Sequence, residues 1–159
     1  MAKEIERKFI VEPAKLPGNL SGIDYQQGYI SINDSGVTRI RIINDKAVLT
    51  IKSKTVEISR DEFEYDIPYK DALRLINLSQ GEVIHKTRSV IEYENKTWEV
   101  DEFHGKNKGL WLAEIELNDE KEDFIKPNWV MEEVSKDKKY YNSYPVSYTH
   151  LTLPTKRIV

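Results

Sequence analysis

Glutamate and lysine alternate in the first strand-like segment of the chain, Glu4-Ile5-Glu6-Arg7-Lys8. In a β-strand every second side chain points to the same face, so Glu4, Glu6 and Lys8 would lie in a row with neighbours roughly 7 Å apart. Carboxylates bind hard cations, and a lysine beside them can bind an anion. The segment therefore predicts a site for a metal-complexed phosphate, unless it is only the charged outer face of a surface strand.

Length and composition limit the classes of protein that this chain can belong to. Its 159 residues favour one domain, and the lack of cysteine excludes disulfides and thiolate metal sites. The three histidines lie far apart and show no zinc-ligand spacing, and no apolar run is long enough for a membrane helix. A net charge of -3 with 32% charged residues argues against a basic nucleic-acid-binding surface. We therefore expect a soluble cytoplasmic protein with no nucleic-acid or membrane partner, and a homodimer is possible.

The elements that must position these residues are mostly strands, because apolar and charged residues alternate with a period of two along most of the chain. Asn33-Asp34-Ser35-Gly36 is a strong turn signal, and a 3.6-residue apolar stripe predicts one helix over residues 71–81. A helical turn is expected within 118–127, and the glycine-containing segment 104–109 is interpreted as a connection between strands. The predicted strands are 2–11, 25–32, 37–43, 47–54, 58–67, 83–94, 97–103, 110–117 and 129–134.

The charged residues are segregated by strand. Arg39 and Arg41 share one face of their strand, whereas Glu114 and Glu116 share one face of theirs. An antiparallel sheet normally buries its apolar face and leaves the charged face in water. The alternative is a closed sheet with the charged face inward, which would form a wide lumen and would need helices and loops to cover its apolar outer face. Such a lumen must hold water and ions, because unpaired buried charges cost several kcal/mol each.

The chain resembles the CYTH, or triphosphate tunnel metalloenzyme, superfamily, and in particular its small bacterial inorganic triphosphatases. The residues at 4–8 match the ExExK signature of that superfamily, and further matches follow in order from about residue 2 to residue 143. They are Gln27-Gly28-Tyr29, Arg39-Ile40-Arg41, Leu49 to Lys52, Arg60 with Glu62 and Glu64, Lys86-Thr87-Arg88, Trp98 to Phe103, Ala113 to Glu116, Glu133-Val134 and Tyr140 to Asn142.

The resemblance implies a mainly antiparallel β fold of the α+β class: an eight-stranded closed β-barrel tunnel with a charged lumen and a few peripheral helices. It also implies hydrolysis of a triphosphate with Mg²⁺ or Mn²⁺, and Lys86 and Tyr29 match positions proposed to act on the nucleophile or the leaving group. Glu62 and Glu64 could pair with cations or help to hold metal. The implied phosphate-binding residues are Lys8, Arg39, Arg41, Lys52, Arg60, Lys86 and Arg88, and the implied metal ligands are Glu4, Glu6, Asp101, Glu114 and Glu116.

Inorganic tripolyphosphate, cleaved to pyrophosphate and phosphate, is the expected substrate because the short chain has no recognisable pocket for an adenine or a thiazolium ring. Nucleoside triphosphatase, thiamine triphosphatase and adenylate cyclase activities remain open as alternatives, as does a non-catalytic polyphosphate binder. We expect the tunnel domain to comprise residues 1–143. Residues 144–159 match nothing expected of the superfamily and are interpreted as an appended, non-native tail that could plug one tunnel mouth.

Overall fold

Antiparallel strands dominate residues 2–140, which are the part of the chain that the computed structural model describes. The predicted tail at 144–159 lies outside the described residues. Within residues 2–140 the nine strands begin and end within two residues of their predicted limits. They are β1 (Ala2–Val11), β2 (Ile23–Asn33), β3 (Gly36–Ile43), β4 (Lys46–Ser53), β5 (Ser59–Ile67), β6 (Ile84–Tyr93), β7 (Lys96–Phe103), β8 (Trp111–Glu116) and β9 (Val130–Glu133).

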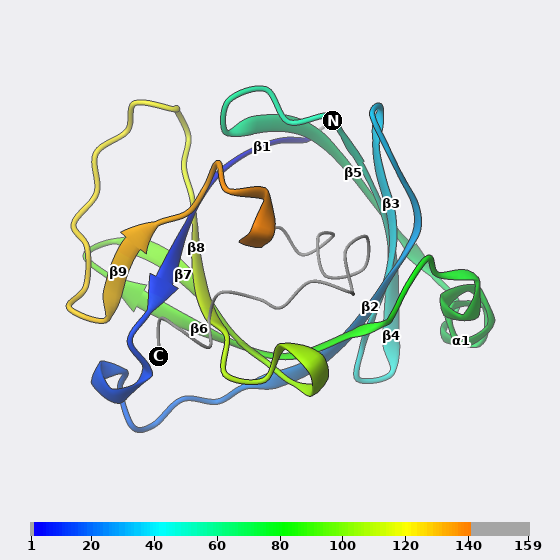
Figure 1. Ribbon diagram of the computed structural model, residues 1–159, viewed down its shortest axis with the longest axis horizontal. Helices are drawn as coiled ribbons and strands as arrows, with labels where there is room; N and C mark the ends of the chain where they lie inside the picture. The colour runs from blue at the N-terminus through cyan, green and yellow to red at the C-terminus, as the bar shows by residue number, and fades with distance from the viewer. Residues whose placement is uncertain (1, 141–159) are drawn as a thin grey trace.

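The sheet closes into a ring because β1 is shared between its two ends (Figure 1). The first half of β1 pairs with β5, with Glu4 opposite Arg60, and the second half pairs with β8, with Lys8 opposite Glu114. Eight strands thus form the ring in the order β5-β4-β3-β2-β6-β7-β8-β1, and β9 adds to β1 where β5 ends. The predicted eight-stranded closed tunnel is confirmed, with β9 as an additional short strand.

Apolar side chains cover the outside of the ring in two places, as a charged lumen requires. The outer faces of β1, β7 and β8 form one cluster around Phe9, Trp98 and Trp129, and the long loop after β8 packs over it. The outer faces of β3 and β4 form the other cluster, which the helix α1 (Tyr69–Leu75) covers through Ala72 and the following turn through Ile76. Burial outside the ring therefore stabilises a sheet whose inner face is polar.

Apolar side chains also fill one end of the interior. Ile10, Ile84 and Phe103 continue the inner faces of their strands beyond the charged residues, and all three are buried in one cluster with Tyr140. The short 3₁₀ helix η4 (Lys138–Tyr140) lies over one side of the ring opening in Figure 1, and the backbone oxygen of Tyr140 accepts a hydrogen bond of 3.1 Å from Lys8 Nζ. Apolar side chains thus replace the charged ones at this end of the interior.

The predicted helix is present with different limits, and the helical turn expected within 118–127 is a single hydrogen-bonded turn. The helix expected over 71–81 begins at Tyr69, directly after Pro68, and its α-helical part ends at Leu75; a single 3₁₀ turn, η2 (Ile76–Leu78), then continues it and ends before Gly81. Within 118–127 the described chain forms no helix but a loop with one turn, in which Glu122 N donates to Asp119 O. The remaining 3₁₀ helices are η1 (Pro13–Lys15) and η3 (Gly105–Asn107), the latter inside the predicted connection between β7 and β8.

Glycine is required where the chain approaches itself closely. A Cβ at Gly28 would lie 2.0 Å from Ser79 Oγ, so the turn after α1 can pack on β2 only if residue 28 has no side chain. Gly36 ends the β2–β3 turn with φ +141°, and a Cβ there would lie 2.0 Å from the backbone oxygen of Lys52. None of the helices within residues 2–140 is long and apolar enough to cross a membrane.

Candidate active site

One cavity inside the ring gathers most of the residues that the sequence singled out. Its lining comes from the inner faces of all eight strands of the ring, and every ring strand except β2 contributes charged residues that turn inward. Tyr29 lines the cavity with them, at the border of the apolar end. The predicted residues in the lining are Glu4, Glu6, Lys8, Arg39, Arg41, Lys52, Arg60, Arg88, Glu114 and Glu116.

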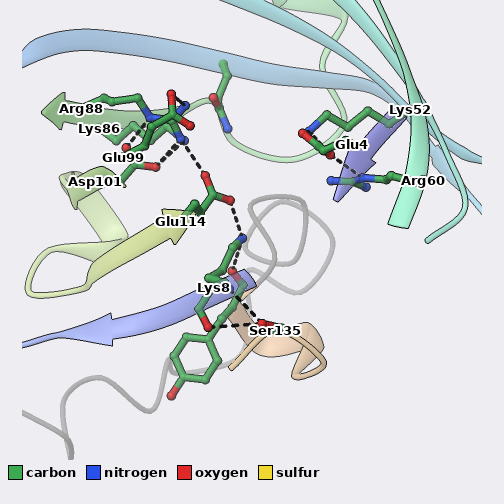
Figure 2. A network of polar contacts seen from close by, with 12 residues as sticks. Glu4, Lys8, Lys52, Arg60, Lys86, Arg88, Glu99, Asp101, Glu114 and Ser135 are labelled. Atoms are coloured by element: carbon green, nitrogen blue, oxygen red, sulfur yellow. Dashed lines mark hydrogen bonds and ion pairs between the residues drawn. The ribbon is translucent and has the colours of Figure 1, made fainter. Parts of the chain in front are cut away.

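Glu4 is the centre of the first group of ion pairs. Its carboxylate accepts hydrogen bonds from Lys52 Nζ at 3.0 and 3.1 Å and from Arg60 Nε at 3.0 Å (Figure 2). Burial by itself raises the pKa of Glu4, but the charges of Lys52 and Arg60 outweigh burial and leave the pKa below its usual value. Glu62 pairs with the same lysine at 3.3 Å. Glu4 is therefore an anion held between two cations.

Arg88 is the centre of the second group. Its guanidinium binds Asp101 through two hydrogen bonds of 2.7 and 2.8 Å and donates a third, of 3.0 Å, to Glu114. Lys8 Nζ lies 3.4 Å from the other oxygen of Glu114. Burial alone raises the pKa of Glu114, yet Lys8 and Arg88 bring it well below the usual value, and the pKa of Asp101 is lowered to about 2 because Lys86 and Arg88 likewise outweigh burial. These carboxylates stay ionised in the tunnel.

Glu6 differs from the other inner carboxylates of β1 and β8. Burial raises its pKa to about 8, and repulsion from Glu114 and Glu4 adds to the effect. The pKa of Glu116 is also raised, first by burial and then by Glu4 and neighbouring glutamates. Carboxylates that repel one another in this way fit a divalent cation, which would relieve the repulsion.

No three acidic or histidine side chains in the described part of the chain already converge on a metal position. Glu4 and Glu114 are instead engaged with lysine and arginine. Mg²⁺ typically takes only one or two carboxylates and completes its shell with water and substrate phosphate. The donor set of the tunnel therefore fits such an ion without a complete protein cage.

Lys86 lies on the same face of β6 as Arg88 and is almost fully buried. Its ammonium nitrogen is 2.8 Å from an oxygen of Asp101. Burial lowers the pKa of Lys86 to about 7; Asp101 opposes the shift, whereas Arg88 and Arg41 add to it. A lysine of this kind can exchange a proton near neutral pH.

Several tunnel residues are absent from the predicted site, among them Glu99, which lines the cavity and lies 3.2 Å from Arg88 Nη1. Gln27 is fully buried and its side-chain oxygen accepts a 3.3 Å hydrogen bond from Arg41 Nε, and Tyr25 lies two residues earlier on the same strand. Their alternation with Tyr29 could have revealed both. Ser135 lines the cavity and accepts a hydrogen bond of 2.9 Å from Lys8 N, but it follows β9, and nothing in the local sequence indicates that this segment reaches the tunnel.

The glutamates whose role the sequence left open both lie close to cations. Glu62 pairs with Lys52, and Glu64 lies 3.9 Å from Arg39 Nη2 and accepts a 3.2 Å hydrogen bond from Thr50. Both glutamates lie on the same face of β5 as Arg60, because the three residues alternate along the strand.

A CYTH domain model matches residues 2–149. The chain belongs to the CYTH domain family. This CYTH protein is 46% identical over 144 residues to an inorganic triphosphatase of Acetivibrio thermocellus, an alignment that covers 90% of this chain and 92% of the relative. An inorganic triphosphatase of Nitrosomonas europaea is 35% identical over 144 residues, with 87% and 93% covered. The crystal structure of the inorganic triphosphatase NE1496 aligns with a TM-score of 0.66 at 34% identity and covers 92% of this chain and 95% of that one.

Proposed function

We propose that this CYTH protein hydrolyses inorganic triphosphate to pyrophosphate and phosphate inside its tunnel. The observation that supports the proposal best is the cavity lining, in which lysines and arginines from five strands face carboxylates from β1 and β8. The names of the two relatives point to the same substrate. Water would attack a terminal phosphorus atom, and the bond from that phosphorus to the bridging oxygen would break.

The basic side chains bind the phosphate oxygens in this proposal. Arginine suits this role because its planar fork can contact two oxygens at once, whereas lysine contributes a point charge. Arg39 has a buried Nε without a hydrogen-bond partner in the described part of the chain, so it offers a donor to an incoming oxygen. The proposed phosphate-binding residues are Lys8, Arg39, Arg41, Lys52, Arg60, Lys86 and Arg88.

The carboxylates hold Mg²⁺ or Mn²⁺. A bound divalent ion supplies charge neutralisation of the phosphate oxygens and activation of water. Glu6 and Glu116 are the ligands that need the ion most, because they lie opposite each other in the register and neither has a short ion pair among the described residues. Glu4 and Glu114 would join them as ligands. Asp101 is a further predicted ligand, and it also forms ion pairs with Lys86 and Arg88.

Lys86 and Tyr29 are proposed as catalytic residues. A pKa near 7 allows Lys86 to take up or release a proton, with Asp101 fixing its position. Neither of these two side chains is part of the cavity lining, so Lys86 would act from just behind it. Tyr29 presents a phenol at the border of the charged and apolar parts of the lumen, where Gln27 Nε2 donates to its oxygen over 3.5 Å.

Phosphate release from tripolyphosphate, pyrophosphate and ATP with Mg²⁺ or Mn²⁺ tests the proposal. The decisive variant carries Glu6→Gln and Glu116→Gln, which replace two carboxyl groups by amides and keep the side-chain shape. The matched control is Glu82→Gln, at a surface position where Glu82 forms an exposed pair with Lys106. We expect tripolyphosphate to be cleaved fastest, with loss of activity in the double variant and full activity in the control.

Absence of turnover for all three compounds by the folded wild-type protein contradicts the proposal. Tight metal-dependent binding of tripolyphosphate without cleavage would then indicate a polyphosphate-binding protein, and formation of cyclic AMP from ATP would indicate a cyclase.

A further inference from the structure

Tyr25, near the start of β2, lies against three cations of the tunnel at once. Its ring centroid is 5.1 Å from Arg41 Cζ, 5.4 Å from Arg88 Cζ and 6.0 Å from Lys86 Nζ. The register explains the grouping, because Tyr25 is directly opposite Lys86 on one side and two positions from the partner of Arg41 on the other. All three distances are in the range in which the face of an aromatic ring attracts a cation.

Arg41 depends on this ring more than the other two cations do. Arg88 and Lys86 each have carboxylate partners, of which Asp101 is shared. Arg41, by contrast, forms no ion pair with any residue in the described range 2–140, and its one hydrogen bond within that range is the 3.3 Å contact with Gln27. Every other proposed phosphate-binding side chain of the tunnel lies within 4 Å of a carboxylate.

The surroundings of Arg41 would otherwise drive its side chain away from the site. Burial, followed by the charges of Arg39 and Arg88, lowers the pKa of Arg41 to about 10, so the group stays charged at neutral pH but is repelled by its neighbours. A carboxylate partner would cancel that repulsion, but it would also neutralise the charge and compete with phosphate for the same N–H donors. The face of a tyrosine ring attracts the guanidinium without accepting its in-plane hydrogen bonds.

We propose that Tyr25 is a positioning residue whose ring holds Arg41 in the tunnel as an un-neutralised cation, ready to bind a phosphate group of the substrate. The inference rests on the proposed function for the identity of the ligand, tripolyphosphate. It predicts that the ring of Tyr25 matters and its hydroxyl does not.

Two substitutions separate the ring from the hydroxyl. Tyr25→Leu removes the aromatic face, and Tyr25→Phe keeps it; Tyr65→Leu is the matched control, because Tyr65 is an exposed tyrosine on β5. Calorimetric titration with tripolyphosphate in EDTA measures affinity, and steady-state kinetics with Mg²⁺ measures kcat and KM. We expect Tyr25→Leu to weaken binding and raise KM roughly tenfold with a much smaller change in kcat, and Tyr25→Phe to restore both values to within about twofold of the wild type.

A third measurement reads the contact directly and needs no ligand. The Nε–H signal of Arg41, assigned by its loss in Arg41→Lys, should show an upfield ring-current shift in the wild type and in Tyr25→Phe. We expect this shift to vanish in Tyr25→Leu. If that variant does not fold, the signal of the wild-type protein still shows whether the ring lies over the guanidinium.

Each result supports or overturns the inference. Equal losses of affinity in Tyr25→Leu and Tyr25→Phe would assign the effect to the hydroxyl and overturn it, as would wild-type affinity in Tyr25→Leu or an unshifted Arg41 signal in the wild type. If the wild type neither binds nor cleaves tripolyphosphate, the proposed function fails; the Arg41 signal then still decides whether Tyr25 positions this cation.

Discussion

The substitution Glu6→Gln should stabilise the metal-free protein and abolish its activity. Glu6 is a carboxyl whose pKa is raised to about 8 by burial and by its neighbours Glu114 and Glu4. At neutral pH the folded protein therefore binds a proton at Glu6 that the unfolded chain releases. Glutamine has the same shape and never needs that proton, so the variant avoids the cost of neutralising the carboxyl on folding.

The size of the effect follows from the two pKa values. The stability contribution of Glu6 is fully present below its unfolded pKa and is lost as the pH rises toward the folded pKa. Each pH unit in this window costs about 1.4 kcal/mol, so a shift from 4.5 to about 8 sets an upper bound of about 5 kcal/mol. Glu6 is only half-buried, and solvent screening reduces the bound; we expect a difference in unfolding free energy of roughly 2 kcal/mol at neutral pH.

Urea unfolding in EDTA at a series of pH values between about 5 and 8 measures this difference, because subtracting the two proteins cancels the other titrating groups to first order. The advantage of Glu6→Gln should grow with pH. Phosphate release with Mg²⁺ should be lost in the same protein, because the amide is a poor ligand for the ion. A stability difference that is independent of pH, or a variant less stable than the wild type throughout, would refute the reasoning.

Three further substitutions test other parts of the structure. Lys86→Arg replaces a lysine of pKa about 7 with a group that stays protonated. In a series of kcat measurements over pH, the change in kcat near neutral pH that the wild type shows should disappear, together with most of the activity. Gly28→Ala places a Cβ 2.0 Å from Ser79 Oγ and should lower the unfolding free energy by about 1–3 kcal/mol, with recovery in the double variant with Ser79→Gly. Arg88→Lys removes the paired hydrogen bonds to Asp101 and should destabilise the fold by roughly 3 kcal/mol in urea unfolding while weakening tripolyphosphate binding.

The period-two pattern predicted the strands well because burial in this ring follows strict alternation. Phe9 and Lys8 are neighbours in sequence but point to opposite faces, one into the outer apolar cluster and one into the lumen. The pattern alone could not decide which face turns inward, because a charged face is normally the wet outer one. The inward direction came from the resemblance to the CYTH superfamily and from the separation of acidic from basic strands.

Contacts between distant segments could not be predicted. Ser135 contacts the backbone of Lys8, and the backbone oxygen of Tyr140 accepts a hydrogen bond from the Lys8 ammonium, because β9 pairs with β1 and brings the following segment to the ring. The limits of the helix differ from the prediction for a related reason: Gly28 lets the turn at Ser79 pack on β2, and this tertiary contact sets where the helical segment ends. Tyr25 was overlooked because aromatic residues in strands are more often part of a core than neighbours of cations.

The ion pairs of the tunnel imply that metal and triphosphate assist each other's binding. Lys52 is paired with Glu4, and Arg88 with Glu114, so phosphate competes with these carboxylates for the two cations. Buried carboxylates left without a cation cost several kcal/mol, and a divalent ion removes that cost by replacing lysine and arginine as their partner. The coupling is reciprocal, so each ligand should tighten the other by the same factor. Calorimetric titration of the protein with tripolyphosphate, once in EDTA and once with Ca²⁺, measures this factor. We expect at least tenfold tighter binding with Ca²⁺, after correction for the Ca²⁺–tripolyphosphate complex that forms in solution. Equal affinities would show that the ion pairs do not oppose binding.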